Sequence, residues 1–367
     1  MQNMLKDKIH RIIVLIPGKN ARGGIANYYN ALFNHLPSNY LGIERGSRNW
    51  PDQQNNLGTF YRLIKDFWEF IKCARINQTK CLVLNTAFYR RSLIREVFYI
   101  ILAKYFCLKI VVFFRGWDTY YVNNLKFYDK LILRMIFTAE IIMDLSSENT
   151  AALKSLGYNG RVILETTLYD VSLLEGFNLQ STVNERYNSM EKNLLYLGRI
   201  EKSKGVYELV DTFQSLKESL KDFSLIIAGD GSELLNLKDY VTSRDISGVI
   251  FTGHVSGRKK AELFQNAFSY IFMSRFEGLP NSVLEAMAFG LPVVSTNVGG
   301  LSTFFDSSNG YLLDVIEHEL IVDYYRNLRN NHELYQSISA NNHFVAKNNF
   351  ASDKVAIRFQ TVINELI

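Results

Sequence analysis

Short apolar runs alternate with stretches of helical spacing along the first half of the chain. The runs are RIIVLIPG (11–18), CLVLNTA (81–87), KIVVFF (109–114), EIIMDLS (140–146) and RVILET (161–166). Each run has the length of a buried strand, and amphipathic segments such as 26–36 and 146–157 stand between them. Strands that alternate with helices predict a mostly parallel, doubly wound sheet.

The same alternation restarts after residues 171–192, which lose the apolar periodicity and are predicted to be a linker. The second set of runs is NLLYLGRI (193–200), FSLIIAGDG (223–231), VIFTGHV (249–255), SYIFMS (269–274) and PVVSTNVGG (292–300). We therefore expect an α/β protein with two doubly wound, Rossmann-like domains that face a central cleft. The expected limits are 1–180 and 181–345, followed by a C-terminal helix over 346–367.

Composition and cysteine content favour an ordinary globular protein of the cytoplasm. Of 367 residues, 47% are apolar and 21% are charged, which excludes a disordered or collagen-like chain. The three cysteines form no CxxC pair, as expected in a reducing compartment. The longest apolar stretch, 97–114, is interrupted by Lys104 and Lys109, so we expect no transmembrane segment. We also expect no secretory signal, because MQNMLKDKIH (1–10) is too polar and RIIVLIPG (11–18) is too short.

The net charge of +5 is unevenly distributed. Residues 1–180 carry 23 Lys and Arg against 14 Asp and Glu, which gives +9, and the remainder carry 18 against 22, which gives −4. The basic half is rich in aromatic residues, as in FYRRSLIREVFYIILAKYF (88–106). Such a surface suits anionic lipid headgroups or a phosphate-bearing acceptor, although a solvated face is an equal alternative. Nucleic acid is not expected, because no zinc-finger, RNP or helix-turn-helix pattern is present.

Several common catalytic motifs are absent from the sequence. Without GxxxxGK[ST] or a GxGxxG after the first strand, a P-loop ATPase and a dinucleotide oxidoreductase are disfavoured. HExxH, GxSxG and D-x-D are also missing, and the six histidines have no metal-ligand spacing. We therefore expect neither a metal site nor a cofactor.

The turn GRIEKSKG (198–205) places two cations between a strand and a helix. Arg199 and Lys204, together with the free N–H groups of a helix N-terminus, would attract a diphosphate. A basic turn that only contacts solvent is the alternative.

Two glutamates flank a Gly-Leu-Pro turn in FEGLPNSVLEAMAFGLPVVST (276–296). Glu285 lies about one turn into the predicted helix, where it could bind both hydroxyls of a ribose, and Glu277 in the preceding loop could reach a sugar hydroxyl. Both could instead only complement the helix dipole. For Glu285 that alternative is weak, because an acid among apolar neighbours requires a partner.

These motifs together resemble the retaining glycosyltransferases of family 4, which have the GT-B fold. The resemblance rests on Gly198-Arg199-x4-Lys204-Gly205, on AGDG (228–231), on Glu277-x7-Glu285 and on NGYLL (309–313), and it is strongest over 193–313. It implies a metal-independent transferase that moves a sugar from a nucleotide-diphosphate sugar, with a UDP-sugar favoured. The implied acceptor is a saccharide or lipid-linked saccharide in capsule, exopolysaccharide or lipopolysaccharide synthesis.

The resemblance also implies a place and a role for each part. The N-terminal domain would bind the acceptor, the second domain would bind the nucleotide-sugar, and the last helix would cross back to the N-terminal domain. The protein would be cytoplasmic and peripheral at the inner face of the plasma membrane.

The donor site would draw on both domains. Arg199 and Lys204 would stabilise the leaving diphosphate, and Glu285 would bind the ribose. Glu277 and the amides of Gly278 and Leu279 would hold the donor sugar and the distal phosphate.

Further positions would complete this site. Gly229, His254 and Val255 would border the base. The loop with Gly23 and Gly24 would approach the donor phosphates, unless it is a simple turn.

The segment RGWD (115–118) follows a predicted strand and resembles a version of the motif found in bacterial polysaccharide transferases. Arg115 would bind a phosphate or sugar oxygen, and Asp118 an acceptor or donor hydroxyl. The alternative is a turn in which Asp118 pairs with Arg115 or caps a helix.

Two departures from the family pattern keep other functions open. Leu301-Ser302-Thr303 follows Gly299-Gly300 where the family has x-Pro-Glu, and Glu165-Thr166-Thr167 replaces an Asn-Gly. A catalytically inactive GT-B subunit that binds sugar or nucleotide for a partner transferase is the main alternative. A GT-B epimerase or phosphorylase fits less well, because the two-glutamate pattern argues against both.

Overall fold

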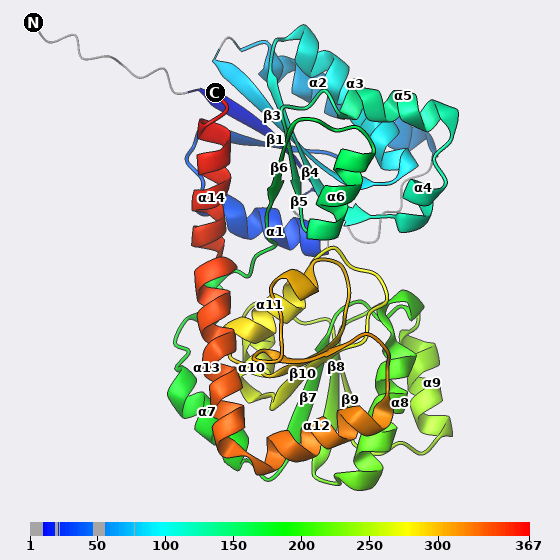
Figure 1. Cartoon of the computed structure of the whole chain (residues 1–367), viewed down its shortest axis with the longest axis vertical. Helices are drawn as coiled ribbons and strands as arrows, with labels where there is room; N and C mark the ends of the chain where they lie inside the picture. The colour runs from blue at the N-terminus through cyan, green and yellow to red at the C-terminus, as the bar shows by residue number, and fades with distance from the viewer. Residues whose placement is uncertain (1–9, 19–20, 22, 47–55, 77) are drawn as a thin grey trace, which may run out of the picture. The chain divides into compact units, whose positions relative to one another are not determined.

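The computed structural model describes residues 10–18, 21, 23–46, 56–76 and 78–367. Over these residues the chain forms two compact units: the N-terminal unit ends at Thr166 but also includes Val355–Ile367, and the C-terminal unit is Thr167–Lys354. Each unit has one parallel sheet flanked by helices (Figure 1). The predicted α/β class with two doubly wound domains is confirmed. The division lies after Thr166 rather than near residue 180.

The N-terminal sheet has the strand order β2-β1-β3-β4-β5-β6. Its strands are β1 (Arg11–Ile16), β2 (Tyr40–Glu44), β3 (Thr79–Phe88), β4 (Lys109–Trp117), β5 (Ile141–Asp144) and β6 (Arg161–Leu164), all paired in parallel. Its helices are α1 (Gly24–Phe33), α2 (Asn56–Ala74), α3 (Arg90–Tyr105), α4 (Thr119–Asn123), α5 (Phe127–Ile136) and α6 (Ser147–Ser155). Strand β2 is not among the predicted strands, because YLGIE has no sustained apolar run.

Alternate strand residues build cores on the two faces of this sheet. One face packs against α2, α3 and α5 through a cluster that includes Leu84, Val112, Phe70, Ile100 and Leu133. On the opposite face Phe113 contacts Tyr28 of α1, with ring centroids 6.0 Å apart. The strand residues on both faces are therefore apolar, as expected for a sheet covered by helices on each side.

The C-terminal sheet has the order β12-β11-β10-β7-β8-β9. Its strands are β7 (Lys192–Leu197), β8 (Phe223–Ala228), β9 (Val249–Gly253), β10 (Ser269–Phe272), β11 (Val293–Thr296) and β12 (Gly310–Leu313), again paired in parallel. Its helices are α7 (Leu179–Asn188), α8 (Val206–Ser219), α9 (Leu234–Ser243), α10 (Gly257–Asn266), α11 (Asn281–Ala288), α12 (His318–Asn330) and α13 (His332–Asn349). Short 3₁₀ turns are η1 (Val171–Leu174), η2 (Lys202–Lys204) and η3 (Leu301–Thr303).

Helix α7 lies in the segment that the sequence predicts to be a linker, so that prediction is wrong for Leu179–Asn188. The Asn178 side chain caps the helix by accepting from the N–H of Ser181 at 3.0 Å. The helix is anchored by Arg186, which is 4% exposed and donates to the carbonyl oxygens of Phe264, Gln265 and Phe289. A charged anchor leaves no apolar periodicity, which is why the pattern gives no signal here.

The C-terminal tail consists of two helices rather than one. Helix α13 ends at Asn349 and α14 (Ser352–Asn364) begins three residues later. Between them the backbone pairs with Tyr169, whose N–H donates to the carbonyl oxygen of Phe350 at 2.9 Å and whose carbonyl oxygen accepts from Ser352 at 3.1 Å. These extended contacts interrupt the helical hydrogen bonding.

From Val355 onward, α14 belongs to the N-terminal unit. Arg358 pairs with the buried Glu165 at 2.6 Å, and Phe359 contacts Tyr40 with ring centroids 6.1 Å apart. The chain thus ends on the unit in which it begins.

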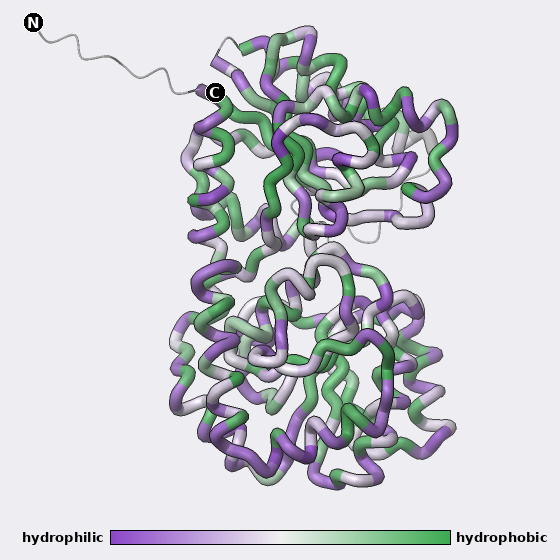
Figure 2. Tube along the Cα trace, in the orientation of Figure 1, coloured by the Kyte–Doolittle hydropathy of each residue, from purple (hydrophilic) through white to green (hydrophobic). Residues whose placement is uncertain are grey.

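The hydropathy of the residues differs between the sheets and the elements that cover them. The strands of both sheets are hydrophobic, and most hydrophilic positions lie on the helices and loops (Figure 2). Among the described residues, no helix has the length and apolar character needed to cross a membrane.

Candidate functional site

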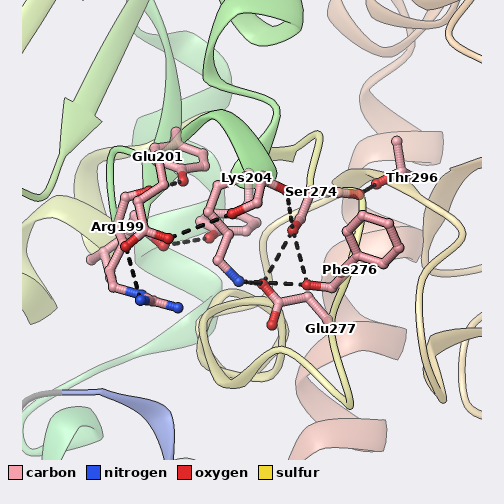
Figure 3. A network of polar contacts seen from close by, with 11 residues as sticks. Arg199, Glu201, Lys204, Ser274, Phe276, Glu277 and Thr296 are labelled. Carbon is pink, nitrogen blue, oxygen red and sulfur yellow. Dashed lines mark hydrogen bonds and ion pairs between the residues drawn. The ribbon is translucent and has the colours of Figure 1, made fainter. Parts of the chain in front are cut away.

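An ion pair between two loops lies at the centre of the C-terminal candidate site. Lys204 Nζ is 2.6 Å from Glu277 Oε1, and the two side chains are 13% and 20% exposed. Lys204 comes from the turn after β7, and Glu277 from the loop between β10 and α11. Ser274 donates to the same carboxylate oxygen at 3.3 Å (Figure 3). Two of the residues that the sequence singles out, 73 positions apart, are therefore in direct contact.

Arg199 lies on the same turn as Lys204. Its Nη1 is 2.8 Å from Glu201 Oε1, and its side chain is 54% exposed (Figure 3). The guanidinium is thus tethered by one surface carboxylate and keeps much of its surface accessible. A partly exposed arginine beside a less exposed lysine forms a region that attracts anions.

Glycines allow the loops of this site to approach each other. Gly205, between η2 and α8, has φ = 66°, and a Cβ there would lie 1.8 Å from the carbonyl oxygen of Met273. A Cβ on Gly229 would lie 1.8 Å from the carbonyl oxygen of Gly198. Side chains at these two positions would separate the strand ends, so the pattern of glycines in the motifs has a steric cause.

Glu285 has a cationic partner from a neighbouring helix. It is 5% exposed, and its Oε1 lies 2.6 Å from Nζ of Lys260 on α10. The expectation that this acid needs a partner is confirmed, but Lys260 itself is not among the predicted site residues. No spacing pattern links the two, because they lie on separate helices 25 residues apart.

One tyrosine lies near both glutamates. Burial raises the pKa of Tyr270 strongly, and the negative charges of Glu285 and Glu277 raise it further. Its hydroxyl donates to the carbonyl oxygen of Leu197 at 3.0 Å. Tyr270 belongs to β10, the strand that leads into the loop of Glu277.

The loop that precedes α11 is held by Thr167, which belongs to one of the two segments that depart from the family pattern, and by Gly300, which directly precedes the other. The N–H of Gly300 donates to the carbonyl oxygen of Gly278 at 2.7 Å. The hydroxyl of Thr167 donates to the carbonyl oxygen of Leu279 at 3.2 Å. These contacts position the backbone of the turn, so the departing segments still support this loop.

His254 and Val255 directly follow β9, at the edge of the sheet near the AGDG turn. The N–H of Gly229 donates to the carbonyl oxygen of Gly253 at 2.8 Å, and the His254 side chain is exposed. The predicted base-bordering residues are thus neighbours in the structure. In the part of the chain that the structure describes, no three His, Cys, Asp or Glu side chains are grouped as for a metal ion.

The remaining predicted residues belong to the N-terminal unit. Gly23 and Gly24 stand at the start of α1, and Gly23 has φ = 128° with open space where a Cβ would be. The N–H of Asn27 donates to the carbonyl oxygen of Gly23 at 3.1 Å. The glycine pair thus stands at the entry to a helix.

Arg115 is buried against aromatic rings. It is 8% exposed, and its guanidinium carbon lies 3.8 Å from the centroid of the Tyr28 ring and 4.6 Å from that of Phe113. Its Nη1 has no hydrogen-bond partner among the described residues. Burial raises the pKa of the neighbouring Tyr29 to about 12, and Arg115 opposes that rise. The π-faces stabilise the cation but leave part of its donor capacity unused.

Asp118 caps a helix, which is one of the two alternatives left open by the sequence. Its carboxylate accepts from the N–H of Tyr121 at 2.9 Å at the start of α4. Its side chain is exposed, so the contact leaves one carboxylate oxygen accessible to solvent.

We expect the cap to account for the stability contribution of Asp118. Asp118→Ala should lower the free energy of unfolding by about 1 kcal/mol, and Asp118→Asn should restore most of it, since both Asp and Asn cap helices. Chemical denaturation of the three proteins measures this. An alanine variant as stable as the wild type would contradict the capping role.

Two doubly wound sheets, one with paired lysine and glutamate side chains at its strand ends, define a Rossmann-like α/β protein with a candidate site for an anionic ligand. Residues 181–343 match the family model for glycosyl transferases group 1. The capsular polysaccharide biosynthesis glycosyltransferase CapM of Staphylococcus aureus is 24% identical over 233 residues, which is 62% of this chain and 58% of CapM. The chain therefore matches less than two thirds of that relative's length.

Solved structures extend the likeness in fold to nearly the whole chain. Sucrose-phosphate synthase from Thermosynechococcus elongatus aligns over 97% of this chain and 99% of its own, with 15% identity and a TM-score of 0.75. HepE of Anabaena, solved with UDP and glucose, aligns over 97% of this chain and 100% of its own, with 16% identity and a TM-score of 0.72. Residues 181–343 thus carry the similarity to the group 1 glycosyltransferases, family 4, and the chain as a whole has the GT-B fold.

Proposed function

We propose that this protein is a retaining glycosyltransferase that uses a nucleotide-diphosphate sugar, with a UDP-sugar favoured. The proposed acceptor is a saccharide or lipid-linked saccharide in the synthesis of a surface polysaccharide. The match of residues 181–343 to the family model supports the reaction type, and the likeness to CapM supports the polysaccharide acceptor. The complex of HepE with UDP and glucose supports the choice of base. The proposed location is the cytoplasm, at the inner face of a membrane.

The Lys204–Glu277 pair is the observation that carries this proposal. Without a ligand, the carboxylate neutralises the ammonium group at 2.6 Å. When a diphosphate binds, its oxygens can share Lys204, and Glu277 is then free to accept a hydrogen bond from a sugar hydroxyl. One ion pair can thus bind the phosphates and the donor sugar in turn, which suits a ligand with both groups.

The same charges serve the departure of the leaving group. As the bond between the anomeric carbon and the phosphate oxygen breaks, negative charge accumulates on the diphosphate. Lys204, Arg199 and the backbone at the start of α8 would stabilise this charge, so the proposal assigns no metal ion. The acceptor hydroxyl forms the new bond on the same face, and its proton passes to the departing phosphate oxygen. The anomeric configuration is thereby retained.

Glu285 is proposed to bind the ribose of the donor. Its ion pair with Lys260 fixes one of its two carboxylate oxygens at 2.6 Å. The second oxygen can accept from a ribose hydroxyl. In the N-terminal unit, Nη1 of Arg115 is free to donate to an anionic or sugar oxygen, and a Cβ on Gly23 would meet open space.

The transfer assay tests the reaction directly. The full chain is incubated with UDP-glucose and a panel of sugar acceptors, and the release of UDP and the anomeric configuration of the product are measured. Retained configuration with UDP release supports the proposal. Nucleotide binding without turnover of any sugar nucleotide, with or without acceptor, would favour the catalytically inactive subunit instead.

We expect Glu285→Gln to weaken donor binding more than turnover. The amide can still accept from a ribose hydroxyl but loses the charge assistance, which corresponds to roughly a tenfold increase in the KM for the sugar nucleotide with a small change in kcat. Steady-state kinetics separate the two parameters. An unchanged KM would remove Glu285 from the donor site.

A further inference from the structure

Three helices on one face of the N-terminal sheet form a continuous layer. Phe67 of α2 contacts Phe98 of α3 with ring centroids 6.1 Å apart, and Arg90 of α3 binds Asp129 of α5 at 2.7 Å. Figure 1 shows α2, α3 and α5 together beside this sheet. Their inner sides carry the buried core of the unit. Their outer sides, here called the α2–α3–α5 face, point away from it.

This outer face carries an unusual number of exposed apolar side chains. Of the 25 large hydrophobic residues that are exposed among the described part of the chain, 11 lie on these three helices. They are Phe60, Tyr61, Ile64 and Trp68 on α2, Ile94, Phe98, Ile101 and Tyr105 on α3, and Phe127, Tyr128 and Leu131 on α5. Single exposed apolar residues are ordinary, but a contiguous group of this kind marks an interaction surface.

The spacing of these residues shows that they follow the outer side of each helix. On α3 they recur at intervals of four, three and four residues, while Leu93, Ile100 and Ala103 of the same helix are buried. Helix α3 is therefore apolar on two opposite sides, and only one of them is used by the fold. On α5, Phe127 is 90% exposed and Leu131 63% exposed.

Positive charge accompanies the apolar residues on the same face. The three helices contain nine Lys and Arg and four Asp and Glu. Six of the basic residues are exposed, namely Lys65, Lys72, Arg91, Lys104, Lys130 and Arg134. On α5, Lys130 and Arg134 lie at the spacing that puts them beside Phe127 and Leu131.

The acidic residues of these helices are turned into the protein. Asp66, Glu96 and Asp129 are each at most 1% exposed. Asp66 accepts from the N–H of Gly46 at 3.0 Å, and Glu96 binds Arg45 at 2.6 Å. Among the described residues of the three helices, Glu69 alone keeps an acid at the surface, where it is 3.9 Å from Lys65. The outer face is thus strongly cationic as well as apolar.

We propose that the α2–α3–α5 face docks on a bilayer that contains anionic lipids. Aromatic and aliphatic side chains would enter the boundary between headgroups and acyl chains, while the lysine and arginine groups would bind the headgroup phosphates. A second copy of this chain fits less well. In a symmetric contact the basic residues of the two copies would face and repel each other, with Glu69 as the one acid at the surface among the described residues of this face. The docking proposal names the lipid surface that the proposed transferase would bind. It rests on the proposed function because that function places the protein at a membrane.

Vesicle sedimentation of the full chain tests the docking surface. The wild type is mixed with vesicles of phosphatidylcholine alone or with one third phosphatidylglycerol, at low and high salt. We expect binding to the anionic vesicles, little binding to the neutral ones, and a loss of binding at high salt. Binding to neither vesicle, or equal binding to both, overturns the proposal.

Surface variants with matched controls identify the residues responsible. Lys130→Gln with Arg134→Gln should weaken vesicle binding by about 25-fold, at roughly fivefold for each charge. Phe98→Ser with Phe127→Ser should weaken it at least tenfold. The controls are Lys259→Gln and Phe344→Ser, which change exposed residues of the C-terminal unit and should bind like the wild type. If the controls lose binding equally, or if the α3–α5 variants keep it, the assigned face is wrong.

Two accompanying measurements separate this proposal from others. Light scattering gives the oligomeric state, and a dimer that dissociates in Phe98→Ser with Phe127→Ser would assign the face to a second copy and overturn lipid docking. The thermal shift with UDP is recorded on the same preparations. UDP binding without vesicle binding contradicts the docking surface alone, whereas vesicle binding without nucleotide binding contradicts the proposed donor site alone.

Discussion

Lys204→Ala is expected to lower kcat by about 10²–10³-fold, the largest effect on activity that the site predicts. Removal of one positioned donor that stabilises charge in the transition state has consequences of this size. In the proposed site, the charge on the leaving diphosphate develops beside Lys204 Nζ, which lies 2.6 Å from Glu277. The variant also leaves that carboxylate facing the phosphates without its counter-ion, which adds repulsion. Steady-state kinetics with a sugar nucleotide measure the loss.

Lys202→Ala is the matched control for this variant. Lys202 belongs to the same 3₁₀ turn but is exposed to solvent. Its replacement removes an equal charge from the same loop and should change kcat less than threefold. If Lys202→Ala and Lys204→Ala reduce activity alike, the effect is one of overall charge. If Lys204→Ala retains near-normal turnover, the proposed role of the ion pair is wrong.

Gly205→Ala should have the largest effect on stability. A methyl group there would lie 1.8 Å from the carbonyl oxygen of Met273, and the residue has φ = 66°. The backbone at Met273, just after β10, would have to move away from the start of α8, in addition to the cost of about 1 kcal/mol for a side chain in the left-handed region. We expect a loss of at least about 3 kcal/mol in the free energy of unfolding of the C-terminal unit. Thermal or chemical unfolding of the variant gives this value.

Gly176→Ala is the control that separates the two costs of Gly205→Ala, the steric clash and the left-handed backbone conformation. Gly176 also has a left-handed conformation, with φ = 74°, but a Cβ at this position meets open space. Its replacement should therefore cost only the conformational term, roughly 1 kcal/mol. Equal destabilisation by the two alanine variants would show that the close approach to Met273 is not important.

The sequence predicts the parallel sheets well because most strands are continuous apolar runs. It does not predict β2 or α7, whose positions in the fold depend on other forces. Arg186 anchors α7 by donating to three carbonyl oxygens, and such contacts leave no periodic signal. The break between α13 and α14 is also hidden, because it depends on backbone pairing with the distant Tyr169.

For the candidate site, the sequence predicts the site residues themselves better than the residues that contact them. The motifs identify Lys204, Glu277 and Glu285, since their spacing around strand ends is characteristic. They do not identify Lys260 as the partner of Glu285, because the contact joins two helices through the tertiary fold. The placement of Arg115 over the ring of Tyr28 is equally hidden, with 87 positions between the two residues in the sequence.

The α2–α3–α5 face shows what a global charge count can and cannot indicate. The excess of basic residues in residues 1–180 is visible in the sequence, and it suits an anionic partner. The burial of Asp66, Glu96 and Asp129 is not visible there, yet it is what makes the outer face of these helices cationic. Only the fold shows that these three acids face inward while six lysines and arginines of the same helices face solvent.

A thermal-shift panel with UDP, GDP, ADP and CMP on the wild type and Lys204→Ala tests the central claim most directly. A nucleotide that binds the folded state raises the melting temperature with increasing concentration. We predict that UDP raises the melting temperature of the wild type and that Lys204→Ala loses most of this shift. If no nucleotide stabilises the wild type at millimolar concentrations, or if the variant responds like the wild type, the proposed donor site is contradicted.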